Sequence, residues 1–182
     1  MGYVILMRHG KREIDHDSPL VNFNSKSLDN CCPEIWNTIH KLVQYDIKRI
    51  ITSPYLRTRQ TAILVQYGYY KTTGKLLDIV IDKRIGEFLN KRSRWKQPSL
   101  EEFDKETLTI YDHKIPLCKE SKELMISRVV EFYNSLKDKS LVITHNGIAS
   151  MIGMFSGKDI NLNFAGYDLV NIKDTENVQL YN

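Results

Sequence analysis

The strongest constraint on the fold is a set of four short apolar runs separated by longer stretches of helical character. The first run, Tyr3–Met7, is continuous and is followed at once by polar residues. That pattern is typical of a strand that is buried on both faces of a sheet. Runs of the same character cover Ile47–Thr52, Leu77–Ile81 and Ser140–Thr144. We therefore predict four strands of one central sheet.

Helices are expected between and after these runs. Four segments have helical character: Pro33–Tyr45, Arg57–Tyr67, Ser121–Leu136 and Gly147–Phe155. Pro33 suits a first helical turn, and Ser121 is a suitable N-cap. Tyr167–Ile172 and Val178–Tyr181 flank a polar turn and are expected to form a terminal hairpin. Strands that alternate with helices predict an α/β layered fold with a mostly parallel central sheet.

Length and composition indicate one domain over residues 1–182. The chain has no long Gly, Pro or Ser linker and no fixed-period repeat. Three cysteines, two of them adjacent at Cys31 and Cys32, do not make a disulfide framework and fit a reducing compartment better than secretion. The opening apolar run is too short for a signal peptide or a membrane span. We therefore expect a cytoplasmic protein without a membrane partner.

Unusual polar residues follow three of the four apolar runs. These segments are 8–12 (Arg-His-Gly-Lys-Arg), 53–62 and 144–147 (Thr-His-Asn-Gly). Sheets of this kind bind ligands beyond the carboxyl ends of their strands, so two histidines and several arginines are expected at one end. Arginine matches phosphate oxygens bidentately, and helix N-termini add backbone donors. The sequence therefore predicts a pocket for a tetrahedral oxyanion, in which a histidine can act as a nucleophile.

Taken together, these segments resemble the histidine phosphatase superfamily, also called phosphoglycerate mutase-like. The triplet at 8–10 (Arg-His-Gly) is similar to the family signature, and 53–62 (Ser-Pro-x-x-Arg-x-x-Gln-Thr-Ala) and 144–147 are similar to its second and third blocks. Glu87 stands where the family keeps its acid, and Glu120, Ser121 and Arg128 resemble a Glu-Ser…Arg stretch. The resemblance covers about residues 3–155. It implies a three-layer α/β/α sandwich.

The resemblance also implies a mechanism. His9 would attack the phosphoryl group and form a phosphohistidine, and Glu87 would protonate the departing oxygen, with Glu101 or Glu102 as alternative acids. Arginines supply the positive charge, so neither a metal nor another cofactor is implied. The residues expected to bind the phosphate are Arg8, Arg12, Arg57 and His145.

Arg12 stands two places after the glycine of the triplet. In this it resembles the branch that includes ecdysteroid-phosphate phosphatases and the related tyrosine phosphatases of T-cell signalling. The implied activity is phosphomonoester hydrolysis of a small phosphorylated substrate or a phosphoprotein, with a variable specificity segment at about 88–118. Two alternatives stay open: a phosphoglycerate mutase-type phosphoryl transferase, and a catalytically idle phosphate-binding module. The oligomeric state is not readable from the sequence.

Other histidines and arginines are expected to be ordinary. Arg59 lies two places after Arg57 and is expected at solvent or at a sheet edge. His16, His40 and His113 have no metal-ligand spacing.

The formal charge of +4, from 26 Lys and Arg against 22 Asp and Glu, is concentrated in Asp82–Lys96. That segment holds six basic residues against two acidic ones, and it is either a solvated loop or a rim that attracts anionic substrates. Trp95 adds an aromatic face to it. Because the other clustered charges lie at the strand ends, we expect a pocket for one phosphoryl group and no nucleic-acid partner.

Overall fold

Five strands form the centre of the computed structural model, which describes residues 2–13, 19–88 and 120–172. Their order across the sheet is β3-β2-β4-β1-β5. The first four are mutually parallel, and β5 runs antiparallel to β1. This confirms the predicted mostly parallel sheet. The strands are β1 (Gly2–Arg8), β2 (Arg49–Thr52), β3 (Asp78–Ile81), β4 (Ser140–Thr144) and β5 (Tyr167–Ile172).

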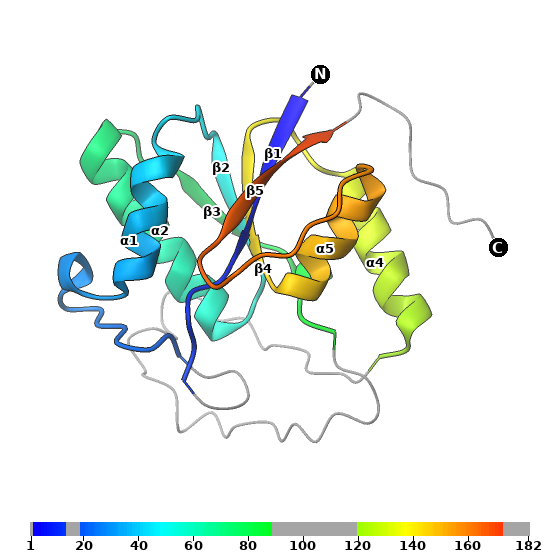
Figure 1. Cartoon of the computed structure of the whole chain (residues 1–182), viewed down its shortest axis with the longest axis horizontal. Coiled ribbons are helices and arrows are strands. Elements are labelled where there is room, and N and C mark those ends of the chain that lie inside the picture. Colours follow the sequence, from blue (N-terminus) through cyan, green and yellow to red (C-terminus); the bar gives the residue numbers. More distant parts are fainter. Residues whose placement is uncertain (1, 14–18, 89–119, 173–182) are drawn as a thin grey trace.

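Within the described ranges, four α-helices cover the sheet in two layers. Figure 1 shows α1 and α2 on one face and α4 and α5 on the other, which confirms the α/β/α sandwich. The helices are α1 (Pro33–Leu42), α2 (Leu56–Thr73), α4 (Lys122–Asn134) and α5 (Asn146–Phe155), with short 3-10 turns η1 (Leu28–Asn30) and η2 (Lys83–Ile85).

The first strand shows why a continuous apolar run is needed here. Successive side chains of a strand point to opposite faces of the sheet. Ile5 and Met7 pack in the core beneath α1 and α2, whereas Val4 and Leu6 pack in the core beneath α4 and α5. All four are completely buried. A strand covered by helices on both faces therefore has no position for a polar side chain.

The helix ends follow local chemistry. Pro33 begins α1, and Ser121 caps α4 by accepting a hydrogen bond from the Leu124 amide at 3.3 Å, as predicted. Helix α2 extends six residues beyond the predicted end at Tyr67, to Thr73. It stops at Gly74, whose φ of 73° is a left-handed conformation that favours glycine.

The terminal strand pairs with the first strand of the chain. β5 pairs with β1, from Gly2 opposite Ile172 to Met7 opposite Tyr167. The predicted hairpin partner, Val178–Tyr181, lies outside the described residues. Cys31 and Cys32 are buried free thiols, as expected. Across the three described ranges, no helix is long and apolar enough to cross a membrane.

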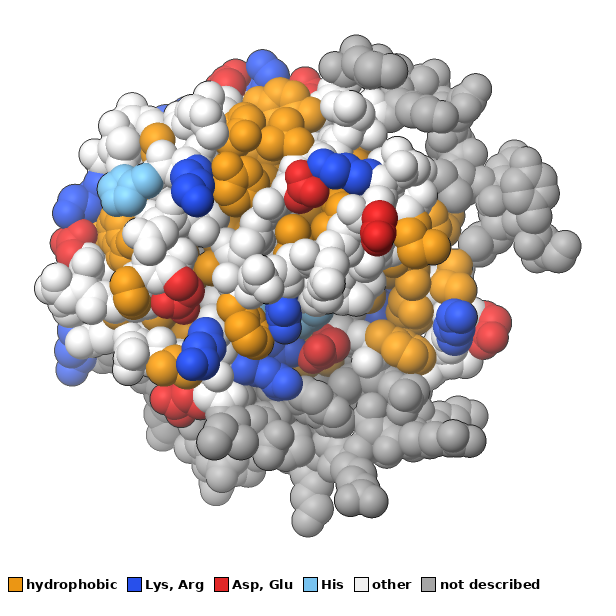
Figure 2. Space-filling model, in the orientation of Figure 1, with side chains coloured by type: hydrophobic (Ala, Val, Ile, Leu, Met, Phe, Trp, Pro, Cys, Tyr) orange, Lys and Arg blue, Asp and Glu red, His pale blue; other side chains and the backbone are white. Residues whose placement is uncertain are grey.

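The parallel register brings the ends of β1, β2 and β4 to one edge of the sheet. Arg8 lies opposite Thr144, and Thr52 lies opposite Ile143. Figure 2 shows the molecule in the orientation of Figure 1. Lys and Arg side chains gather there with acidic ones at the lower end of the view, the end toward which β1 and β4 run. The polar segments that follow the strands therefore begin side by side.

Candidate active site

Backbone hydrogen bonds continue the sheet into the polar segments. The His9 amide donates to the Thr144 carbonyl at 3.1 Å, and the Ser53 amide donates to the Ile143 carbonyl at 3.0 Å. His9, Ser53 and His145 thus stand on adjacent chain segments although they are distant in sequence. The rings of His9 and His145 meet edge to face, with centroids 5.3 Å apart.

The hydrogen bonds of His9 fix its tautomer. Nδ1 lies 2.7 Å from the Gly10 carbonyl oxygen, which can only accept, so Nδ1 carries the proton. Nε2 therefore keeps its lone pair and accepts a hydrogen bond from Arg57 Nε at 3.1 Å. The ring is almost fully buried. This arrangement holds a neutral imidazole with its unprotonated Nε2 facing the arginine.

Burial and neighbouring charge keep both site histidines neutral. Burial, followed by the positive charge of Arg57, lowers the pKa of His9 to about 3. The same two causes lower the pKa of His145 well below its ordinary value. Arg12 contributes to both shifts through its charge, so it lies within electrostatic reach of the pocket. Arg12 itself forms an isolated antiparallel β-bridge with Leu20.

Arg57 is the hub of the site. It is completely buried in the first turn of α2, and its guanidinium donates to His9 Nε2, to His145 Nδ1 at 3.1 Å and to the Glu87 carboxylate. Its guanidinium carbon also lies 4.7 Å from the centroid of the Tyr55 ring. The planar guanidinium of Arg57, with its several donors, thereby connects residues that follow three different strands.

His145 carries its proton on the other ring nitrogen. Arg57 can only donate, so Nδ1 of His145 accepts, and Nε2 is protonated and donates to Ser53 Oγ at 2.9 Å. Tyr55 packs edge-on against the ring, with centroids 4.9 Å apart. These contacts fix the orientation of the imidazole at the start of α5.

Arg8 contacts the loop before β5. Its Nη1 donates to the Leu162 carbonyl at 2.9 Å, and its guanidinium lies 3.9 Å from the centroid of the Phe164 ring. Burial, opposed by the charge of Glu87, lowers the pKa of Arg8 from its ordinary high value. The group stays cationic, because an arginine does not lose its proton in proteins. Arg8 and Arg57 thus place two guanidinium groups beside one neutral histidine.

Glu87 is the acid that the fold brings to this centre. Its carboxylate forms an ion pair with Arg57 and lies 3.9 Å from His145 Nδ1. The turn before it is attached to the end of β4, because Thr144 Oγ1 donates to the Ile85 carbonyl at 2.7 Å. Glu101 and Glu102, the alternative acids, lie outside the described residues.

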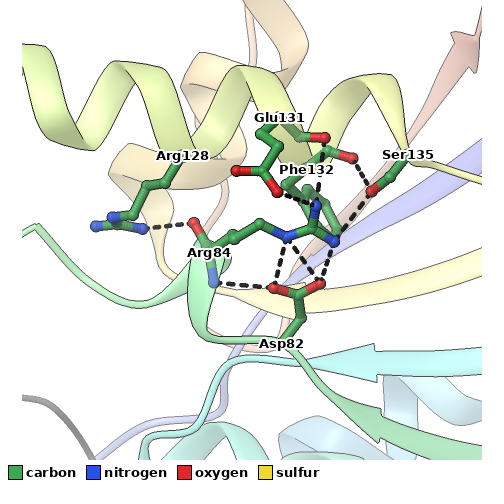
Figure 3. A network of polar contacts seen from close by, with 6 residues as sticks. All are labelled: Asp82, Arg84, Arg128, Glu131, Phe132 and Ser135. Atoms are coloured by element: carbon green, nitrogen blue, oxygen red, sulfur yellow. Dashed lines mark hydrogen bonds and ion pairs between the residues drawn. The ribbon is translucent and has the colours of Figure 1, made fainter.

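A second polar network fixes this turn against α4 (Figure 3). Arg128 pairs with Glu120 and donates to the Arg84 carbonyl. Arg84 in turn pairs with Asp82 at 2.6 Å and with Glu131 at 3.2 Å. Arg84 is therefore neutralised by two carboxylates and is not part of a free basic rim. Of the other basic residues of that segment, 91, 92, 94 and 96 lie outside the described residues, as does Trp95.

The expectation for Arg59 was wrong. Its side chain is buried rather than at solvent or at a sheet edge. The reason is that every residue from Leu56 to Ala62 is buried, so the first turns of α2 have no exposed face. Helical periodicity cannot distinguish faces in such a segment.

The remaining predicted residues have ordinary or untested surroundings. His40 lies exposed on α1 beside Trp36, while His16, His113 and Cys118 lie outside the described residues. Within the part of the chain that the structure describes, no group of three or more His, Cys, Asp or Glu side chains is arranged to hold a metal ion.

Three contributors were not identified from the sequence. Ser53 and Thr61 lie inside the segment 53–62, but only the structure assigns them contacts: Ser53 with His145, and Thr61 Oγ1 with the Gly10 amide at 3.1 Å. Phe164 lies in the loop before β5, with its ring centroid 5.6 Å from that of His9. No local signal marks Phe164, because its proximity to the site depends on how β5 pairs with β1.

The lowered pKa of His9 predicts that stability falls in mild acid. The unfolded chain binds a proton on this histidine near pH 6.5, whereas the folded chain does so only near pH 3. The contribution is therefore full above about pH 6.5 and is lost as the pH falls toward 3. Each such histidine adds up to about 1.4 kcal/mol per pH unit to the slope of the free energy of unfolding against pH.

Urea unfolding between pH 7.5 and 4.5 measures this slope. His9→Gln is expected to make it shallower than in the wild type, and His40→Gln, at an exposed position, is the matched control. Equal slopes in the wild type and His9→Gln would contradict the assignment of a neutral buried His9.

Comparison with known proteins supports the fold. The sequence matches no family model and no curated protein. Among solved structures, TTHB049 from Thermus thermophilus is 20% identical, with a TM-score of 0.59 and 93% of each chain covered. Mycobacterial hydrolase 2 is 15% identical, with a TM-score of 0.58 over 92% of this chain and 81% of that one. Mycobacterial hydrolase 1 is 14% identical, with a TM-score of 0.57 over 93% and 88%. These neighbours are consistent with a phosphoglycerate mutase-like fold.

Proposed function

We propose that the protein is a phosphomonoester hydrolase that acts through a phosphohistidine on His9. The observation that carries this proposal is the state of His9, whose neutral Nε2 faces the guanidinium of Arg57. A neutral nitrogen is nucleophilic, and the adjacent cation binds the anion that it attacks. The names of the two mycobacterial hydrolases agree with hydrolytic chemistry on this fold.

In the first step, His9 Nε2 attacks phosphorus in line with the ester oxygen. The Nε2–P bond forms, the P–O bond to the alcohol breaks, and the departing oxygen takes a proton from the Glu87 carboxyl. Arg8, Arg12 and Arg57 donate to the equatorial phosphoryl oxygens or balance their charge. His145 joins them by turning its Nε2–H from Ser53 Oγ to a phosphoryl oxygen. A bound phosphate dianion competes with Glu87 for the guanidinium of Arg57.

In the second step, water attacks the phosphohistidine. Glu87, now a carboxylate, accepts one proton of that water as its oxygen bonds to phosphorus. The Nε2–P bond then breaks, and its electron pair returns to the imidazole. Inorganic phosphate leaves and the enzyme regains its starting state. In this scheme the arginines provide the charge stabilisation, and no metal ion takes part.

Hydrolysis of p-nitrophenyl phosphate in the presence of EDTA tests the proposal. We expect turnover by the wild-type protein that persists with the chelator. No turnover on this ester or on a panel of alkyl and sugar phosphates would overturn the hydrolase and favour a phosphate-binding module. Phosphoryl exchange between phosphoglycerates faster than phosphate release would favour a mutase instead.

Glu87→Gln is expected to separate esters by their leaving groups. An alkoxide needs a proton as it departs, whereas a nitrophenolate leaves without one. The substitution should lower kcat/KM, which reports formation of the phosphohistidine, by about 10²–10⁴-fold on alkyl phosphates and by much less on p-nitrophenyl phosphate. Glu123→Gln, at an exposed position in the first turn of α4, is the control. Equal losses on both esters would remove Glu87 from the acid role.

A further inference from the structure

We infer that the alcohol part of the substrate is apolar and uncharged, and that it occupies a hollow beside Glu87. This inference rests on the proposed function and specifies its substrate class. The hollow is lined by Glu87, Phe88, Met125, His145, Gly147 and Ile148. It therefore lies between the turn that carries Glu87, helix α4 and the start of α5.

The position of the acid identifies the leaving-group side of the site. A general acid must lie within hydrogen-bond reach of the oxygen that it protonates. In-line attack places that oxygen on the side of phosphorus opposite His9. The group attached to the oxygen therefore extends from the phosphoryl pocket past Glu87. The hollow begins at Glu87 and His145, so it occupies the place of that group.

The walls of the hollow determine what can bind there. Phe88, Met125 and Ile148 present apolar side chains, and all three belong to or pack against the core beneath α4 and α5. Among the described residues that line the hollow, the carboxylate of Glu87 is the only ionised group, and there is no lysine or arginine. Of the neighbouring arginines, Arg84 and Arg128 are paired with carboxylates, and Arg57 belongs to the phosphoryl pocket, where it contacts Glu87 and His145.

These features select against anionic alcohols. A carboxylate or a second phosphate in the hollow would lose its hydration against apolar walls and find no lysine or arginine among the described lining residues. An alkyl or aryl group gains free energy there in proportion to the area that it buries. The hollow thus favours phosphate monoesters of hydrophobic alcohols or phenols over phosphoglycerates and phosphorylated sugar acids.

A substitution at Gly147 can fill the hollow without removing any of the side chains that line it. Gly147 stands near the start of α5, and a Cβ built on it meets no atom within 4 Å. A larger side chain at this position therefore enters open space that the hollow shares. Gly147→Leu is expected to occupy the volume that the leaving group would take.

A series of n-alkyl phosphates tests the inference with the wild-type chain. Their leaving groups have nearly equal basicity, so differences in kcat/KM report contact rather than chemistry. From methyl to hexyl phosphate we expect kcat/KM to rise by two- to about fourfold per methylene, and then to level off when the hollow is full. An ω-carboxyalkyl phosphate of equal length is expected to react at least about tenfold more slowly than its uncharged counterpart.

Two variants test whether the dependence of kcat/KM on chain length arises in the hollow. Gly147→Leu should flatten the dependence on chain length, whereas Met154→Leu, an exposed position on the same helix, should keep the wild-type slope. A wild-type slope near zero, or faster reaction of the carboxylated esters, would overturn the inference and leave the hydrolase intact. An unchanged slope in folded Gly147→Leu would also overturn it. Failure to hydrolyse any ester, p-nitrophenyl phosphate included, would instead overturn the proposed function on which the inference rests.

Discussion

His9→Ala is expected to reduce phosphomonoester hydrolysis by at least about 10⁴-fold. Loss of the nucleophile removes the covalent route, and the remaining groups only bind and polarise the ester. Alanine at this position also leaves the donors of Arg57 without the Nε2 acceptor that they have in the folded protein. The expected loss is therefore in kcat, with continued binding of phosphate or vanadate to the arginines.

Rapid mixing with ³²P-labelled substrate gives a direct readout. A phosphohistidine is stable in alkali and labile in acid, so label that survives an alkaline quench and is released by acid identifies the intermediate. We expect it in the wild type and in the exposed control His40→Ala, and not in His9→Ala. Substantial turnover or alkali-stable label in His9→Ala would place the nucleophile elsewhere.

Arg57→Lys is expected to cost about 10²–10³-fold in kcat/KM although it keeps the charge. Lysine carries one ammonium group, whereas the guanidinium of Arg57 contacts His9, His145 and Glu87 at the same time. Loss of the planar fork should loosen the orientation of His145 and weaken binding of the equatorial oxygens. Arg57→Met should lose more, because it also removes the positive charge from a buried position.

The charge of Arg57 has a second measurable effect. It is the largest cause after burial of the lowered pKa of His9, so Arg57→Met should raise that pKa toward its ordinary value. Histidine NMR titration of the folded variant measures this shift. Arg59→Lys is the matched control, because Arg59 is also a buried arginine of α2. An unchanged titration of His9 in Arg57→Met would show that the charge of Arg57 does not set its state.

The fold was predictable because it depends on local patterns. A run such as Tyr3–Met7 can be stable only where both faces of the strand are covered, and the structure buries it on both faces. The cap at Ser121 and the proline at the start of α1 are set by chemistry within one helical turn. The end of α2 was missed by six residues, because its final turn, residues 70–73, is exposed and carries no apolar periodicity.

The candidate site was predictable only in outline. The segments after β1, β2 and β4 were expected at one edge because parallel strands share their direction, and the register confirms that they converge. Arg84 and Arg59 show where this reasoning fails. Both are arginines near the site in sequence, yet Arg84 is neutralised by Asp82 and Glu131, and Arg59 is buried within the first turns of α2.

The sequence by itself therefore determined the layered α/β fold and the set of histidines and arginines at the strand ends. These features follow from the periodicity of apolar residues and from strand direction, which are both local. Only the tertiary structure decided which nitrogen of His9 is protonated, which arginine donates a hydrogen bond to His9, and which side chains line the hollow beside Glu87. Those properties depend on contacts between segments as distant in sequence as those of His9 and His145, and on the burial that raises the cost of charge.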